Sequence, residues 1–271
     1  MKKAFNHTVR GRTAVVTGAS SGIGAAFAAR LAQEGYNLIL IARRKDLLSK
    51  LALDLENKHH VSAAVLAADL TADEDVRKVE KRISGDNSID ILVNNAGFGT
   101  RGFFVEVDPE KSQNMVYLHV MATLRLTAAA LPGMIANRRG YIIQVSSIGS
   151  LFTTSHYVVY SATKAFINMF TLGLHKELAG TGVKVQVLCP GLTDTGFMRT
   201  DEFRSFDYSS VPDFVWMSPE QVAEESLKAL QKNKPVFIPG AGNRIFVRAL
   251  KTPGVKRILG GLFKLLGGKF Y

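Results

Sequence analysis

Apolar, often β-branched runs alternate along the chain with segments in which apolar residues recur at helical spacing. The apolar runs predict strands at 13–18, 36–42, 61–70, 89–97, 140–147, 183–191 and, in a shorter form, 234–240. The segments between them predict helices at about 22–35, 45–58, 71–83, 109–134, 157–178 and 218–230. Strand and helix therefore follow one another regularly over most of the chain.

Strands that are apolar throughout and separated by helices are typical of a parallel sheet that is covered on both faces. We therefore expect an α/β fold, a doubly wound parallel sheet of about seven strands with helices on both faces. Ligands of such sheets bind in a crevice at the carboxyl ends of the strands. No internal linker interrupts the pattern, so residues 1–240 are predicted to form a single domain and residues 241–271 a C-terminal extension.

The composition narrows the class of protein. An apolar content of 46% over 271 residues supports a large core. Cys189 is the only cysteine, which excludes an internal disulfide framework, and the six histidines lack metal-site spacing, so no metal is expected. The basic N-terminal segment lacks the apolar region of a secretory signal, and no run of about 18 apolar residues predicts a membrane span. A cytoplasmic location is therefore the expectation.

The formal net charge of +11 is concentrated near the C-terminus. Residues 226–271 hold ten of the 34 lysines and arginines and no acidic residue, which leaves 24 basic and 23 acidic residues in 1–225. The body of the protein is thus nearly neutral. This distribution argues against a nucleic-acid-binding surface on the main domain.

The first predicted strand ends in TGASSGIG (17–24), which leads directly into a helix. Glycines at 18, 22 and 24 allow backbone N–H groups and the helix N-terminus to meet a pyrophosphate. The spacing is G-x-x-x-G-x-G rather than the commoner G-x-G-x-x-G. A dinucleotide site is the favoured interpretation, and a flexible turn is the alternative.

The end of the second predicted strand indicates which dinucleotide binds. A carboxylate there would bind a ribose 2′-hydroxyl and favour NAD. Here Ala42 takes that place, and Arg43, Arg44 and Lys45 follow. Because a cluster of cations suits a 2′-phosphate, we expect NADP(H), with a solvated basic loop as the alternative.

Tyr160 and Lys164 lie four residues apart in the predicted helix 157–178, so their side chains share one face. A phenol with its ordinary pKa of about 10 is a poor proton shuttle near neutral pH. A nearby ammonium favours the phenolate and lowers that pKa, which would make the pair a general acid and base. The alternative is an ordinary helix with a half-buried tyrosine and a solvated lysine.

These motifs, taken in order, resemble the short-chain dehydrogenase/reductase family, and the resemblance covers about residues 11–240. They are TGASSGIG at 17–24, Asp69-Leu70 after the third strand, NNAG at 94–97, Ser147, YSATK at 160–164 and PGLTDT at 190–195. The resemblance implies a Rossmann-like fold. It also implies an NADP(H)-dependent oxidoreductase that transfers hydride between the cofactor and a carbonyl or alcohol.

The resemblance implies roles for individual residues. Tyr160 would exchange a proton with the substrate oxygen, Lys164 would lower the Tyr160 pKa and bind the nicotinamide ribose, and Ser147 would hold the substrate oxygen. Ser146 is the rival to Ser147, but it would point to the other side of the strand end. The implied cofactor contacts, with Arg43 at the 2′-phosphate, are Gly18, Ser20, Ser21, Gly22, Ile23, Gly24, Arg43, Arg44, Asp69, Leu70, Asn94, Ala96, Gly97, Tyr160, Lys164, Pro190, Gly191 and Thr195.

One position departs from the family pattern. Members usually carry a catalytic asparagine in the long helix after NNAG, and the matching residue here is His119, whereas Asn114 lies five residues too early. His119 would join the proton relay through its backbone carbonyl or its ring. The alternative is a helix histidine whose hydrogen bonds are satisfied beside the active site.

Residues 194–217 would form the substrate loop, and their many aromatic side chains predict a lid over an apolar substrate. We expect a lipophilic ketone or aldehyde, or an acyl carbonyl, and the alternative is a loop that only packs on the body. A catalytically silent NADP-binding sensor or scaffold with a membrane- or partner-binding tail is the alternative function. The resemblance also suggests a homodimer or homotetramer.

The extension 241–271 has the pattern of two short amphipathic helices separated at Thr252-Pro-Gly. Arg244, Arg248 and Lys251 recur at helical spacing, and apolar residues follow them. This composition fits peripheral contact with a membrane surface. It fits equally a segment that covers the substrate pocket or packs on another subunit.

Overall fold

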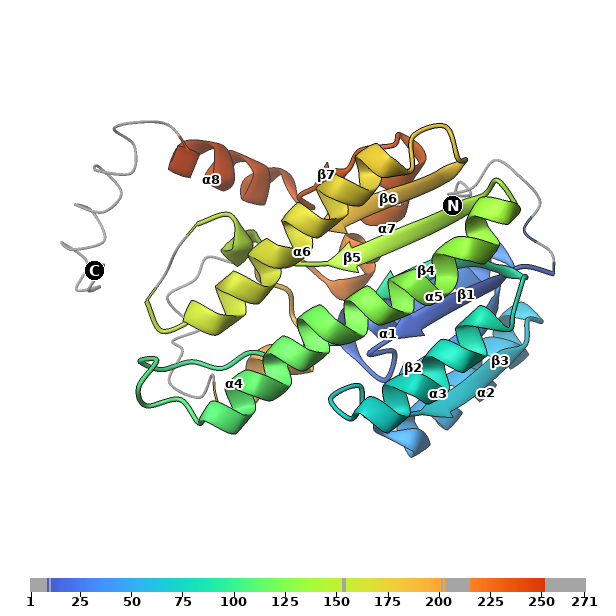
Figure 1. The fold of residues 1–271 in the computed structure, drawn as a ribbon, viewed down its shortest axis with the longest axis horizontal. Helices are drawn as coiled ribbons and strands as arrows, with labels where there is room; N and C mark the ends of the chain where they lie inside the picture. Colours follow the sequence, from blue (N-terminus) through green and yellow to red (C-terminus); the bar gives the residue numbers. More distant parts are fainter. Residues whose placement is uncertain (1–8, 10, 153–154, 201, 203–214, 252–271) are drawn as a thin grey trace.

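A computed structural model describes residues 9, 11–152, 155–200, 202 and 215–251. Their strands form one seven-stranded parallel sheet in the order β3-β2-β1-β4-β5-β6-β7 (Figure 1). The strands are β1 (Thr13–Thr17), β2 (Asn37–Ala42), β3 (Ala63–Ala67), β4 (Ile89–Asn94), β5 (Gly140–Val145), β6 (Val183–Leu188) and β7 (Val236–Phe237). This sheet confirms the predicted doubly wound α/β fold.

Helices cover both faces of the sheet, with α3, α5 and α6 on the near face in Figure 1 and α1, α2 and α7 on the far face. The α-helices are α1 (Gly22–Glu34), α2 (Lys45–His59), α3 (Asp73–Ser84), α4 (Pro109–Val116), α5 (Thr123–Ala136), α6 (Val158–Glu177), α7 (Pro219–Gln231) and α8 (Ala241–Lys251). Shorter helical segments are η1 (Tyr117–Ala122), η2 (Ile148–Ser150) and η3 (Gly196–Arg199).

Alternate residues of each strand face different helical layers. In β1, Ala14 and Val16 pack with α1, α2 and α7, while Val15 packs with α3 and α5. Because both faces are buried, the strand needs apolar residues at every position, which explains its unbroken apolar run.

Two elements differ from the expected pattern. The predicted strand 61–70 is limited to Ala63–Ala67 at the edge of the sheet, where its residues are partly buried or exposed. The predicted helix 109–134 runs from Pro109 to Ala136, but its middle, Tyr117–Ala122, is π-helical. Helical periodicity predicts that a segment is helical and not which hydrogen-bond ladder it uses.

The continuous helix Pro109–Ala136 is, by length and composition alone, apolar enough to cross a membrane. In the fold it packs against the sheet, and Leu118, Leu126 and Met134 lie in the core beneath it. It is therefore the central helix of one layer, which its apolar composition reflects.

The first helix of the predicted extension packs on the main body. In α8, Asn243 and Val247 are buried, and Asn243 Nδ2 donates to the carbonyl oxygen of Pro239 at 3.0 Å. The division at residue 240 stays a prediction. The second predicted amphipathic helix lies outside the described residues.

Candidate active site

The candidate site lies where the strand order reverses, between β1 and β4, at the carboxyl ends of the strands. The two strand ends are joined through Thr17, whose Oγ1 accepts from the N–H groups of Asn95 (2.9 Å) and Ala96 (3.0 Å). The loops that follow these strands line a cleft of about 660 Å³. The fold thus opens a cleft of ligand size at the position expected for a doubly wound sheet.

The glycine loop fits a dinucleotide pyrophosphate. Helix α1 begins at Gly22 without a side-chain cap, so its first N–H groups face the cleft as an anion site. Gly24 lies two residues further on, in the first turn of α1: a Cβ there would overlap the carbonyl oxygen of Gly18 and lie 2.6 Å from Asn95 Nδ2. Only glycine lets α1 approach β1 closely enough to present those N–H groups.

Two arginines after β2 border the same end of the cleft. Arg44 Nη2 donates to the hydroxyls of Ser20 (2.8 Å) and Ser21 (2.7 Å), so its guanidinium lies against the glycine loop. Arg43 pairs with Asp69, with 3.8 Å between Nη1 and Oδ2, and both side chains are exposed. The cations are therefore gathered beside the residues predicted to hold the adenosine end.

The end of β5 and the helix α6 bring the predicted catalytic side chains together. Ser147 Oγ accepts from the N–H of Gly149 (3.0 Å) and is hydrogen-bonded to the Tyr160 side chain. Ser146 Oγ instead donates to the carbonyl oxygen of Lys164 (2.9 Å). Both serines line the cleft, but Ser147 bonds to the Tyr160 side chain, whereas the hydroxyl of its rival Ser146 holds α6 against the sheet.

Burial dominates the electrostatics of the pair on α6. It raises the pKa of Tyr160 to about 12, although the hydrogen bond with Ser147 opposes the rise. It also lowers the pKa of Lys164 to about 8. Lys164 Nζ lies 5.8 Å from the centre of the Tyr160 ring and donates to the carbonyl oxygen of Val145 at 2.9 Å. The causes of the shift at Tyr160 are burial, Ser147, Cys189 and Tyr157 and do not include Lys164, so the expected lowering of the Tyr160 pKa by Lys164 stays a prediction.

His119 lies in the π-helical segment and is 1% exposed. Its Nε2 accepts from the N–H of Phe98 (3.3 Å), and its Nδ1 is 2.9 Å from Thr163 Oγ1. Burial and the charge of Lys164 hold the His119 pKa well below its ordinary value. The ring is therefore neutral and bonded at both nitrogens to protein groups.

Most of the predicted site residues line the cleft, and three do not: Gly24, Asn94 and His119. Asn94 is buried and its Nδ2 donates to Thr127 Oγ1 (3.1 Å), towards α5. Its neighbour Asn95 lines the cleft instead and donates from Nδ2 to the carbonyl oxygen of Thr17 (2.9 Å). Alternation along the strand end could have separated these two asparagines.

The cleft also has apolar lining residues. Phe197 packs on Tyr160 with 6.1 Å between ring centres, and the cleft also has walls that sequence reasoning did not single out. These walls are Phe98, Leu118, Ile148, Phe152, Tyr157 and Leu192. Most of the predicted substrate loop 194–217 lies outside the described residues.

Within the described ranges, no group of three or more histidine, cysteine, aspartate or glutamate side chains is arranged to hold a metal ion.

Comparisons with known proteins agree with this arrangement. An uncharacterized oxidoreductase of Staphylococcus saprophyticus is 34% identical over 238 residues, covering 88% of this chain and 97% of that protein. A short-chain dehydrogenase of Sphingobium yanoikuyae, solved in complex with NADPH, is 33% identical with a TM-score of 0.80, covering 92% of this chain and 95% of that one. A bulky-bulky ketone specific alcohol dehydrogenase of Comamonas testosteroni is 32% identical with a TM-score of 0.77, covering 93% and 94%. Since the family model of the short chain dehydrogenases matches residues 12–204, over this same cleft, the chain belongs to that family of oxidoreductases.

Proposed function

We propose that the protein is an NADP(H)-dependent oxidoreductase that reduces a lipophilic ketone, aldehyde or acyl carbonyl, or oxidises the corresponding alcohol. The observation that carries the proposal is the meeting of Ser147, Tyr160 and Lys164 in one cleft. The cleft has cations at one end and aromatic walls at the other. Similarity to a dehydrogenase solved with NADPH supports the same cofactor here.

Each catalytic side chain has a distinct task in the proposed reaction. The bound nicotinamide supplies or accepts the hydride. Because burial raises the Tyr160 pKa to about 12, the phenol keeps its proton at neutral pH and donates it to the substrate oxygen during reduction. Ser147, hydrogen-bonded to Tyr160, holds that oxygen, and Lys164 binds the nicotinamide ribose and keeps a positive charge near the phenol.

NADP(H) is preferred over NAD(H) in this proposal because of the arginines. Arg44 already bonds two hydroxyls of the glycine loop, so it is oriented to share a 2′-phosphate with Ser20. Arg43, on the adjacent position, adds a second exposed cation. In NAD-preferring relatives of this fold a carboxylate takes the place that Ala42 occupies here.

The substrate class follows from the walls of the cleft. Phe197 packs on Tyr160, and Phe98 and Phe152 add apolar surface to the described lining of the same cleft. The ketone specificity named for the Comamonas testosteroni enzyme supports a bulky apolar carbonyl. Comparable turnover of small polar and long apolar carbonyls would contradict this assignment.

The remaining parts of the proposal concern partners and location. Val116, Met121, Val158, Phe166 and Met169 are exposed apolar residues on the helices from α4 to α6, which supports a homodimer or homotetramer. Location in the cytoplasm stays a prediction.

Contact of the extension 241–271 with a membrane surface also stays a prediction, supported by exposed apolar side chains of α8. Ile245 is 68% exposed and Phe246 44% exposed. Phe246 also packs on Phe152 of the cleft with 6.2 Å between ring centres, which supports the alternative of a segment that helps to cover the pocket. Liposome co-sedimentation of the full chain and a 1–240 variant separates the two, since equal behaviour excludes membrane binding through the extension.

The test of the function combines cofactor titration with a carbonyl series. Fluorescence titration should show tighter binding of NADPH than of NADH, and oxidation of NADPH should increase with the chain length of the carbonyl. Tyr160→Phe should lower kcat by about 10²–10⁴ while NADPH binding stays unchanged. Binding without turnover of any carbonyl would favour the silent sensor instead.

A further inference from the structure

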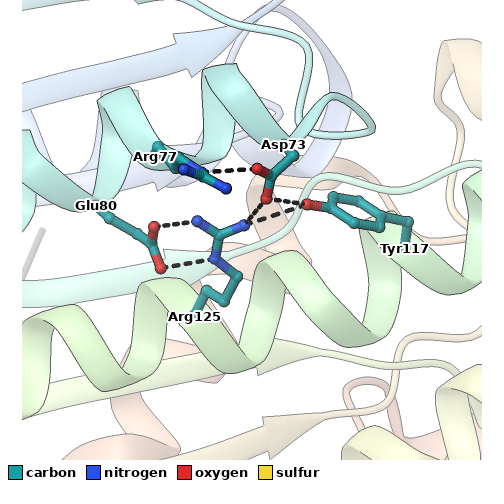
Figure 2. Close-up of polar contacts among 5 residues, drawn as sticks. All are labelled: Asp73, Arg77, Glu80, Tyr117 and Arg125. Atoms are coloured by element: carbon teal, nitrogen blue, oxygen red, sulfur yellow. Dashed lines mark hydrogen bonds and ion pairs between the residues drawn. The ribbon is translucent and has the colours of Figure 1, made fainter.

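The π-helical segment 117–122 is held by side chains on two sides. On the outer side, Tyr117 Oη donates to Asp73 (2.8 Å), which also pairs with Arg77 and Arg125 (Figure 2). Arg125 in turn donates two hydrogen bonds to the Glu80 carboxylate. This network joins the segment to α3, so the segment is fixed from outside the active site.

On the inner side, His119 bonds to two different parts of the site. The Phe98 N–H belongs to the loop after β4, and it donates to Nε2, which must therefore carry a lone pair. Thr163 Oγ1 lies on α6 and donates its own proton to the carbonyl oxygen of Tyr160 at 2.8 Å. Since that hydroxyl proton is used, Thr163 accepts from His119, and Nδ1 carries the imidazole proton.

Glycine at position 97 preserves this arrangement. A Cβ at Gly97 would lie 2.7 Å from His119 Nε2 and 3.5 Å from Lys164 Nζ. The imidazole and the lysine thus approach the same backbone on which the cofactor is proposed to lie. The His119 ring also packs edge-on against the Tyr160 ring, with 5.9 Å between centres.

We propose that His119 is a positioning residue, a neutral hydrogen-bond bridge that links the loop after β4 to the backbone of Tyr160 through Thr163. It fixes the phenol relative to the cofactor-binding loop and takes no part in moving protons. This inference rests on the proposed function, since it assigns a task within that same site.

The geometry favours a bridge over a relay for a simple reason. A relay residue must exchange a proton with the next group, but both ring nitrogens of His119 are committed to protein partners that are not acids or bases. The ring is also almost fully buried and does not line the cleft. Threonine hydroxyls in helices commonly donate to a backbone carbonyl of the preceding turn, as Thr163 does. The added feature here is the His119 imidazole, which joins Thr163 to the loop after β4.

The tautomer can be tested without any substrate. In the full-length protein labelled with ¹⁵N-histidine, His119→Asn identifies the His119 signals by their loss. We expect the neutral Nδ1–H form at pH 6.5, the ordinary pKa of histidine, because burial and Lys164 disfavour the charged ring. An Nε2–H form, or a protonated ring at that pH, overturns the proposal even if no carbonyl substrate has been found.

Kinetics test the link to Tyr160. Thr163→Val keeps the shape but removes the hydroxyl, so kcat per folded molecule should fall about tenfold, while the Kd for NADPH and the pKa values of the pH–rate profile stay unchanged. Thr163→Ser keeps the hydroxyl and should restore kcat. The double variant His119→Asn/Thr163→Val should lose no more than His119→Asn alone, because both break one bridge.

His175→Asn, on the same helix and away from the cleft, is the matched control and should leave kcat unchanged. A changed pH–rate profile in His119→Asn would indicate a relay and overturn the proposal. So would unchanged kcat in Thr163→Val with only a lower Tm, since that outcome indicates a purely structural contact. If the unmodified enzyme turns over no carbonyl, the proposed function fails and the tautomer measurement still decides the bridge.

Discussion

Replacing Lys164 with methionine tests whether the buried ammonium group destabilises the folded protein. Lys164 is 6% exposed, and burial lowers its pKa from 10.5 to about 8. At pH 7 the Lys164 side chain is therefore protonated in both states, but the folded protein binds that proton more weakly than the unfolded chain does. The gap between the two pKa values corresponds to about 3 kcal/mol, at about 1.36 kcal/mol for each pKa unit.

An opposing effect reduces this gain. Methionine cannot donate to the carbonyl oxygen of Val145, which Lys164 Nζ reaches at 2.9 Å, and an unpaired buried carbonyl costs about 1 kcal/mol. Desolvation of the charge outweighs this loss. Lys164→Met should therefore be inactive yet more stable at pH 7 by about 2 kcal/mol, which raises Tm by about 4 °C for a chain of this size.

The pH dependence distinguishes this explanation from improved packing. Because the folded pKa of Lys164 lies below the unfolded one, the unfolded state binds more protons between about pH 8 and pH 10.5. Over that window the wild type gains stability relative to Lys164→Met, and the advantage of the variant disappears. Tm measured for both proteins from pH 7 to 10.5 follows this change.

The matched control is Lys184→Met. Lys184 Nζ also donates to a backbone carbonyl, that of Gln231 at 3.1 Å, but this lysine is only half-buried. Its replacement should lower stability or leave it unchanged at every pH. If Lys164→Met is less stable than the wild type at pH 7, or if their difference does not vary with pH, the desolvation argument is wrong.

Three further changes test other parts of the site. Arg44→Ala should raise the Kd for NADPH about 10- to 100-fold and leave the Kd for NADH nearly unchanged, as measured by fluorescence titration; equal loss for both would refute a 2′-phosphate contact. Gly24→Ala should weaken both cofactors and lower stability by about 1–3 kcal/mol, because its Cβ overlaps the Gly18 carbonyl; unchanged binding would show that α1 can shift at no cost. Arg125→Met should lower Tm by about 2–4 °C, since it removes the link between α3 and α5, and an unchanged Tm would mark the network as energetically neutral.

Much of the fold could be predicted because both faces of the sheet are buried. Most strands are marked by mainly apolar runs, although Asp90, Gln144, Lys184 and Gln186 interrupt β4, β5 and β6. Even the two-residue strand Val236–Phe237 falls within its predicted segment. The edge strand Ala63–Ala67 is shorter than its run, since an alanine-rich sequence gives little indication of where pairing ends. The apolar pattern does not predict backbone details such as the π-helical segment Tyr117–Ala122.

In the candidate site, too, local spacing predicts some features, whereas others depend on contacts between distant parts of the chain. Tyr160 and Lys164 are four residues apart on one helix, so local spacing was enough to place them together. The partners of His119 lie 21 and 44 residues away, on a loop and on another helix. No local pattern could assign its tautomer, and the sequence left a relay and a satisfied histidine open.

The proposed substrate end depends in part on elements that carry none of the family motifs. Phe152, a wall of the cleft, packs on Phe246 of α8, a helix that follows the last motif by some fifty residues. The proposed proton transfer needs only side chains on α6 and directly after β5, two elements that hydrogen bonds tie together, whereas the proposed substrate end is also bordered by loops and by this later helix. Relatives with the same motifs can therefore share one chemistry and differ in substrate, and for this chain the carbonyl series must be measured on a protein that retains α8.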